Sequence, residues 1–323
     1  MTTHAQHLLV ACCFAGSTLL GCKPEVGQAP SLITDYALLA VKGEPAEATP
    51  DENVVYSFLL ASPAGTVTDA TAGWDVCETP KPPAENNSVA SACNPPEPGA
   101  ATGQTFSAPV LTNACMLFGP IAPPVATGQP AIRPRDPDST GGYYLPVRVK
   151  FPDLETGPLT GFAFERITCN LANAATDIVA EYNKRYQSNN DPGIAATDVT
   201  RADGSSFNLD TNPDVNPQTI APGESVVFTA TFADGSAETF PVLNQTGDAL
   251  VDQTESLYMS WFATSGSFEH DRTGVAGTDT ATSTSNTWKA PETTTAMSVY
   301  LWLVLRDSRG GTAFKSYSIQ VAP

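Results

Sequence analysis

One segment of the chain occurs twice, and this repeat restricts the folds that the chain can adopt. Residues 50–58 read PDENVVYSF and residues 222–230 read PGESVVFTA, so in each a proline-containing turn opens a run of β-branched and aromatic residues. Apolar side chains alternate along both runs, as on strands with one buried face. They are Val54, Tyr56, Phe58 and Leu60 in the first run and Val226, Phe228, Ala230 and Phe232 in the second. The repeat predicts two related β domains.

Two further features follow the repeated segment in the same order in both halves. A tryptophan comes first, Trp74 in one half and Trp261 in the other. An apolar strand comes later, at residues 143–149 and at residues 299–305. We therefore expect a tandem duplication of one β-sandwich plan, for which a chain of 323 residues has enough length.

The second half resembles bacterial immunoglobulin-like and polycystic-kidney-disease-type repeats. The matching features are the core strand around Trp261, a Trp-Lys-Ala-Pro turn at residues 288–291, a hydrophobic strand that runs into an Asp-x-x-Gly-Gly hairpin at residues 307–311, and an alternating final strand at residues 313–321. The match covers residues 195–323 well and residues 34–151 weakly. It implies a mostly β protein with two immunoglobulin-like β-sandwiches, at residues 34–169 and 195–323, and one connecting α-helix.

The arrangement as a whole also resembles predicted lipoproteins of predatory, gliding soil bacteria of the myxobacterial type, a group largely without an assigned function. This resemblance rests on the tandem plan, on the segment from Trp74 to Cys77, and on the sequence PKPPAENN at residues 80–87. It implies a lipoprotein but names no ligand.

The N-terminus carries a second constraint. The apolar run from Leu8 to Leu20 is too short to span a bilayer as a helix but has the length of a signal-peptide core. Leu19-Leu20-Gly21-Cys22 resembles the box that precedes cleavage in bacterial lipoproteins, which implies removal of residues 1–21 and a diacylglycerol on the Cys22 thiol. Residues 22–33 would be the tether. The alternative is simple secretion.

Charge and composition limit the partners. The formal net charge is −18, and no Asp, Glu, Lys or Arg lies in residues 1–21, so the exported part carries all of it. The lack of basic clusters disfavours nucleic acid and anionic lipid surfaces as partners. Lys23, directly after the proposed lipidation site, favours the outer membrane, because in enteric bacteria an Asp there favours the inner membrane.

Four cysteines remain beyond the leader and Cys22. They are Cys77, Cys93, Cys115 and Cys169. In an oxidising compartment they form two disulfides, for which three connectivities exist. We favour Cys77 with Cys93 and Cys115 with Cys169, the first as a local clip and the second as a tie to the segment that leaves the first sandwich. A four-thiolate metal site is the rival, but the chain lacks a Cys-x-x-Cys pair.

Two segments interrupt the strand pattern. Apolar residues at spacings of three and four predict an amphipathic helix from about Asn170 to Asn189, within the connecting region 170–194. The stripe consists of Leu171, Ala175, Ile178, Tyr182 and Tyr186. We expect it to pack across the junction of the sandwiches, with a partner-binding groove helix as the alternative. The proline-rich residues 118–142 cannot form a core, so they are a draped or disordered loop or, alternatively, a recognition loop.

A metal site is a weak candidate. Asp210, Asn212, Asp214 and Asn216 place oxygen ligands at every second position, which could surround calcium. The string lacks the glycine and the bidentate glutamate of an EF-hand loop, and an ordinary acidic turn explains it equally well. We expect no bound metal and no cofactor.

Catalytic candidates are few, because His270 is the only histidine outside the leader. A triad or a histidine-based zinc site would have to use it, and we expect an exposed loop residue instead. Carboxylate pairs for glycoside hydrolysis could be Glu269 with Asp271, or Asp234 with Glu238, although the spacing selects neither pair.

Tryptophans are the remaining candidates for ligand contacts. We expect Trp74, Trp261 and Trp302 to lie in cores. Trp288 follows a Thr- and Ser-rich stretch, so a partly exposed Trp288 that stacks on a sugar is an alternative.

These observations predict a lipid-anchored cell-envelope protein, exposed to the periplasm or on the cell surface. We expect it to act as a non-enzymatic binding or scaffolding module, with loops displayed on rigid sandwiches and an envelope protein or surface glycan as partner. The alternatives are a carbohydrate-binding module and, less well supported, a carboxylate-dependent glycan hydrolase.

Overall fold

A computed structural model describes residues 29–81, 89–93, 101–119, 127, 142–171, 174–210 and 219–323. Several sequence predictions fall outside these residues. They are the lipidation site Cys22, the tether up to residue 28, most of the proline-rich loop, and the calcium candidates Asn212, Asp214 and Asn216.

The first sandwich consists of two sheets that face each other. One sheet has the order β1-β3-β4, with β7 also paired to β3, and the other has the order β2-β9-β8-β5-β6. The strands are β1 (Ala37–Glu44), β2 (Glu47–Ala48), β3 (Asn53–Ser62), β4 (Gly65–Thr66), β5 (Ala72–Val76), β6 (Ala101–Gly103), β7 (Thr105–Pro109), β8 (Gly142–Phe151) and β9 (Leu159–Thr168). Two short helical turns, η1 (Ser91–Cys93) and α1 (Ala114–Leu117), lie between the strands.

The second sandwich has sheets of order β11-β10-β13-β19-β17 and β12-β21-β20-β16-β18. Its strands are β10 (Ile194–Thr200), β11 (Ser206–Asn208), β12 (Thr219–Ile220), β13 (Ser225–Phe232), β16 (Leu257–Ala263), β17 (Ser267–Phe268), β18 (Arg272–Val275), β19 (Ser283–Lys289), β20 (Met297–Asp307) and β21 (Thr312–Val321). A separate two-stranded ribbon, β14 (Thr239–Leu243) with β15 (Leu250–Thr254), interrupts it. The mostly β class predicted from the sequence is confirmed.

The same pairings occur in both sandwiches. A short parallel pair, β2 with β9 and β12 with β21, lies at the edge of one sheet in each. An antiparallel pair with a register shift, β1 with β3 and β10 with β13, opens the other sheet. The tryptophan strands β5 and β16 pair with the long strands β8 and β20, which in turn pair with β9 and β21. The repeat in the sequence is therefore a repeat of strand topology.

Each sandwich encloses one apolar core, and the equivalent tryptophans lie at its centre. Trp74 stacks on Phe106, with 5.9 Å between ring centroids, and Trp261 lies 5.7 Å from Phe268. Both tryptophans are fully buried. Burial of large aromatic side chains from both sheets supplies much of the apolar area that holds the two layers together.

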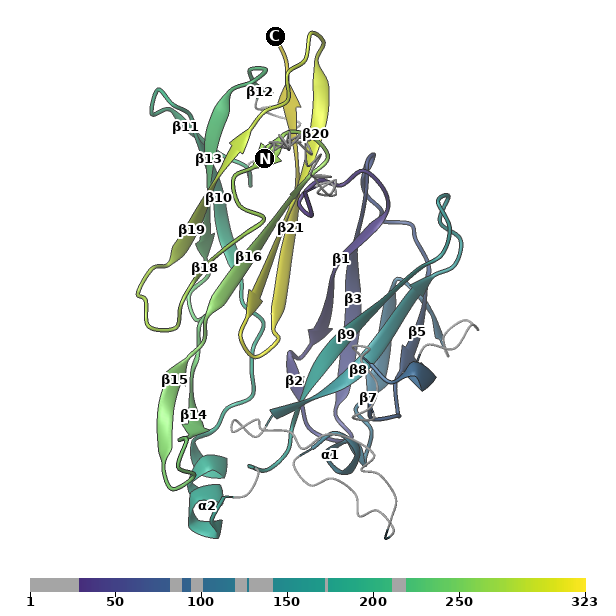
Figure 1. Cartoon of the computed structure of the whole chain (residues 1–323), viewed down its shortest axis with the longest axis vertical. Helices are drawn as coiled ribbons and strands as arrows, with labels where there is room; N and C mark the ends of the chain where they lie inside the picture. The colour runs from purple at the N-terminus through teal and green to yellow at the C-terminus, as the bar shows by residue number, and fades with distance from the viewer. Residues whose placement is uncertain are drawn as a thin grey trace, which may run out of the picture.

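The connecting helix differs from the prediction. Helix α2 covers only Thr176–Arg185, and residues 186–193 have no regular secondary structure. Of the expected stripe, Leu171 and Ala175 lie before the helix, and Tyr182 is the single buried residue within it. The helix ends early because backbone groups beyond it bind distant carboxylates, as the N–H of Asn189 does with Glu47 (2.9 Å). Helix α2 packs beside β14 at one end of the molecule and does not cross the junction (Figure 1).

Candidate functional site

The two sandwiches lie side by side and share an apolar contact (Figure 1). The outer face of β1 and β3 packs against the outer face of β16, β20 and β21. The buried members of this contact are Ile33, Leu39, Ala40, Leu59, Ala61, Trp302 and Val304. Side chains donate hydrogen bonds across it, from Trp302 Nε1 to Thr66 Oγ1 (2.8 Å) and from Arg306 Nη2 to the carbonyl of Leu39 (2.9 Å). Trp302 therefore belongs to the contact between sandwiches and not to the core of one sandwich.

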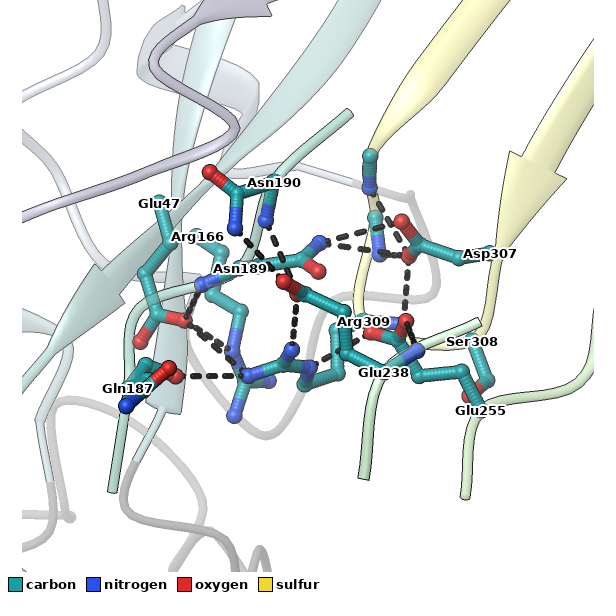
Figure 2. A network of polar contacts seen from close by, with 12 residues as sticks. Glu47, Arg166, Gln187, Asn189, Asn190, Glu238, Glu255, Asp307, Ser308 and Arg309 are labelled. Carbon is teal, nitrogen blue, oxygen red and sulfur yellow. Dashed lines mark hydrogen bonds and ion pairs between the residues drawn. The ribbon is translucent and has the colours of Figure 1, made fainter. Parts of the chain in front are cut away.

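A buried network of charges lies at one end of this contact (Figure 2). Its centre is Arg309, whose side chain is 2% exposed. Its guanidinium donates to Glu255 from Nε (2.6 Å) and to Glu238 from Nη2 (2.7 Å). Nη1 lies 3.8 Å from Oε2 of Glu47, which belongs to the first sandwich. The arginine therefore joins carboxylates from both sandwiches.

The first sandwich contributes its own half of the network. Glu47 on β2 is fully buried and pairs with Arg166 on the adjacent strand β9 (3.3 Å). The same carboxylate accepts the hydroxyl of Tyr186 (2.6 Å) and the backbone N–H of Asn189 (2.9 Å), both from the segment between the sandwiches. Glu47 thus contacts three separate parts of the chain, which are β9, the segment between the sandwiches and, through Arg309, the hairpin of the second sandwich.

The hairpin between β20 and β21 is shaped to enter this network. Asp307 accepts the backbone N–H groups of Arg309 (2.8 Å), Gly310 (2.7 Å) and Gly311 (2.9 Å) through Oδ1, which closes the turn. A side chain on Gly311 would place its Cβ 2.2 Å from Oδ2 of Asp307, so this position requires glycine. The Asp-x-x-Gly-Gly pattern in the sequence is therefore what directs Arg309 into the junction.

Burial shifts the proton equilibria of the network. Burial and the charge of Asp307 together raise the pKa of Glu255 to about 7, against the opposing effect of Arg309. Burial alone would lower the pKa of Arg309, but its hydrogen bond and charge interaction with Glu255 outweigh this and raise it. Separation of a buried ion pair leaves a buried charge without a partner, which costs free energy. The pairs of this network therefore hold the two sandwiches in one arrangement.

The two disulfides lie in and next to the first sandwich. Cys77 is joined to Cys93 and Cys115 to Cys169, the connectivity that we favoured from the sequence. Cys169 directly follows β9, so the second disulfide ties the end of this strand to α1.

Most catalytic and ligand candidates from the sequence lie apart. His270 and Glu269 are exposed, with side chains 60% and 62% accessible, and Asp271 is also exposed. Of the other pair, Asp234 is exposed, whereas Glu238 is engaged by Arg309. Neither pair is among the residues that line the three cavities between and beside the sandwiches that the structure gives.

Trp288 and Asp210, the one calcium candidate within the described residues, have structural roles. Trp288 is fully buried and donates to the carbonyl of Ser265 (3.3 Å), so the alternative of an exposed sugar platform at Trp288 is wrong. Asp210 accepts the N–H of Thr197 (2.9 Å) and the hydroxyl of Tyr317 (2.9 Å). Within the described residues, no group of three or more His, Cys, Asp or Glu could hold a metal ion.

The network was not predicted from the sequence, although the sequence contains a signal for it. Residues 162–169 place Glu165 and Arg166 in the middle of an otherwise apolar strand, where both are buried. Adjacent charges inside a strand point to two opposite faces, so at least one of them must find a buried partner. Which partner it finds depends on contacts with residues more than a hundred positions away, as between Glu47 and Tyr186.

No protein-family model matches the chain, and no curated protein matches it in sequence. Among solved structures, the chain is similar to the D00-D0 domain of Intimin, with a TM-score of 0.21 and 11% identity over 90% of this chain and 99% of that chain. Domains 4 and 5 of the S-layer protein SbsC give a TM-score of 0.19 and 9% identity over 88% and 99%. Dimeric latent PorU from Porphyromonas gingivalis gives 0.22 and 11% over 89% of this chain but 24% of that chain.

TM-scores of this size carry no argument about function, and the fold class rests on the strands themselves. Within the described parts of the chain, no helix has both the length and the apolar character needed to cross a membrane.

Proposed function

We propose that the protein is a lipid-anchored, non-enzymatic module of the bacterial cell envelope, in which two sandwiches form one rigid unit that spaces or displays a binding surface. The buried junction around Arg309 is the observation that carries this proposal. Domains joined by a linker move relative to each other unless their interface is large and well packed. Here an apolar contact and a buried charge network both hold the angle between the sandwiches, as a spacer or scaffold requires.

Alignment of the protein in solution tests the rigidity. Residual dipolar couplings from β8 and β9 and from β20 and β21 should fit a single alignment tensor in the full chain. The variant Arg309→Met has a side chain of similar length without the charge. Its residual dipolar couplings should require two alignment tensors, one for each sandwich. Two tensors for the unaltered chain would contradict the proposal.

The anchor is tested separately. The proposal assigns the lipid to Cys22, so Cys22→Ala should abolish both labelling with an alkyne fatty acid and recovery in the membrane fraction. Cys12→Ala and Cys13→Ala, which alter cysteines in the same leader, are matched controls and should retain both. Labelling that persists in Cys22→Ala would exclude this residue as the anchor.

The partner would be an envelope protein or a surface glycan, and the formal net charge of −18 opposes nucleic acid. Cross-linking of the full chain in its own membranes, followed by mass spectrometry, should capture a partner in constant proportion. The burial of all four tryptophans removes the observation on which a tryptophan-based sugar module rested. The hydrolase alternative predicts loss of turnover in Glu269→Ala or Asp271→Ala, whereas we expect no turnover to lose.

A further inference from the structure

A cavity of about 230 Å³ lies between the sandwiches, beside the charge network. Val41, Gly43 and Glu165 line it from the first sandwich, and Arg306 and Thr312 line it from the second. This is the space of several water molecules, and therefore enough for a small polar head group.

Glu165 is the buried polar group of this cavity. It lies on β9, faces inward, and is 4% exposed. Its Oε1 has no hydrogen-bond partner among the described residues. On the other side of the carboxyl group, a Cβ on Gly43 would lie 2.2 Å from Oε2, so the glycine makes room for this side chain. A buried acceptor without a partner is costly, and in a cavity it marks a place where a donor could bind.

The charges that act on Glu165 are negative. They come from Asp191, Glu47 and Glu52, and together with burial, which is the larger effect, they raise the pKa of Glu165 to about 9. Its carboxyl group is therefore protonated near neutral pH in the empty cavity. A positive charge in the cavity would reverse this effect and favour the carboxylate.

The cations nearest to the cavity already have acceptors. Arg306 donates to the carbonyl of Leu39 (2.9 Å), and Lys42 pairs with Glu44 (2.9 Å) and Asp191 (3.4 Å).

The remaining titratable groups that line the cavity are phenols. Burial, with the charge of Glu165 as a smaller effect, raises the pKa of Tyr56 far above its usual value, so Tyr56 stays neutral. The ring of Tyr144, together with that of Phe164, also lines the cavity, and both side chains are exposed, so the cavity is reached from solvent. Aromatic faces of this kind attract cations.

We propose that this cavity binds a small cation with N–H donors, a primary ammonium group, with the carboxylate of Glu165 as its counter-ion. The ammonium N–H groups supply the donor that Oε1 lacks. On binding, Glu165 releases its proton to solvent, and the ammonium takes its place as the positive partner. The inference does not depend on the lipid anchor, but it rests on the proposed rigid junction, because residues of both sandwiches line the cavity.

The carboxyl carbon of Glu165 in ¹³C NMR spectra of the full chain provides the test, with methylammonium as the probe. We expect saturable binding that lowers the pKa of Glu165 by about one unit or more, corresponding to about tenfold weaker proton binding. The affinity should rise with pH by the same total factor, about tenfold for a shift of one unit, between the pKa of Glu165 in the bound protein and its pKa of about 9 in the free protein, as ionised Glu165 becomes more abundant. Tetramethylammonium, which has the same charge but no N–H, and potassium should give no such shift.

Two variants complete the experiment. Glu165→Gln resembles the protonated side chain and should fold, but it should bind methylammonium at least about tenfold more weakly, as expected for loss of a charged hydrogen bond. Glu44→Gln, an exposed acid on the neighbouring strand, should bind as the unaltered chain does. An unshifted Glu165 signal in the unaltered chain, an equal response to tetramethylammonium or potassium, or full binding by Glu165→Gln would each overturn the proposal.

Discussion

The two sandwiches share one set of strand pairings but are stabilised in different ways. The first contains both disulfides, and its pairings are interrupted by the proline-rich insertion between α1 and β8. The second contains no cysteine, and its buried apolar cluster, which includes Trp261 and Trp288, is the larger of the two among the described residues. Within one topology, covalent links can therefore substitute for buried apolar area.

The equivalent hairpins of the two sandwiches differ in the same way. The turn between β8 and β9, residues 152–158, is largely exposed, whereas the turn between β20 and β21 places Arg309 in the junction. One hairpin is therefore a simple connection, and the other forms part of the contact between the sandwiches.

Arg309→Met should give the largest effect of any single change. It leaves Glu255 buried without its cation and takes one of two cations from Glu47, which keeps Arg166, so we expect a loss of about 3–5 kcal/mol in the free energy of unfolding. Denaturant titration measures it. Arg272→Met, at an exposed arginine of the same sandwich, is the control and should change little. A loss below about 1 kcal/mol would show that the network contributes no more than a surface pair.

The disulfides should matter to one sandwich only. Replacement of Cys115 and Cys169 by Ala opens a loop with a sequence separation of 54, against 16 for Cys77 and Cys93. Both losses should be about 2–4 kcal/mol, and the first should exceed the second by about 1 kcal/mol, because the longer loop gains more entropy on unfolding. Hydrogen exchange should accelerate in β8 and β9 and remain slow in β13 and β19. Equal acceleration in both sandwiches would contradict independent stabilisation.

The pH dependence of stability should distinguish the two sides of the junction. In the folded state, Glu165 keeps its proton up to about pH 9, and Glu255 keeps its proton up to about pH 7. In the unfolded chain, both groups release their protons above about pH 4.5. The free energy of unfolding therefore falls as pH rises through this window, by about 1 kcal/mol per pH unit for each group. Glu165→Gln should remove the slope between pH 7 and pH 9 and reduce the slope between pH 4.5 and pH 7, where Glu255 continues to contribute. An unchanged slope above pH 7 would assign it to another group.

Exposed strand positions should give the smallest effect. Val55 and Val227 are equivalent in the repeat and are 46% and 39% exposed. Each substitution by Thr should change the free energy of unfolding by less than about 0.5 kcal/mol, because neither side chain is buried and both residues remain β-branched. A large loss of unfolding free energy for only one of the two variants would contradict this expectation, because it would show that this valine makes a contact that its equivalent does not.

Local patterns in the sequence were sufficient to predict the strands but not the junction. Alternation at Val226 and Phe228 marks a buried face because the pattern follows from the backbone of the strand itself. The helix was predicted too long because its C-terminal continuation is set by tertiary hydrogen bonds, such as that of Asn189 with Glu47. The partners of Arg309 belong to segments that only the folded chain brings together. Periodicity carries no information about such contacts.

The N-terminal segment has a mechanical consequence. Before entering β1 of the first sandwich, the chain passes along β16 of the second, where Ile33 donates to the carbonyl of Ala263 (2.8 Å) and Ala263 donates to the carbonyl of Ser31 (2.9 Å). A pulling force applied at the N-terminus is therefore transmitted to the second sandwich before it reaches the first. These two hydrogen bonds shield β1 from load for as long as they hold.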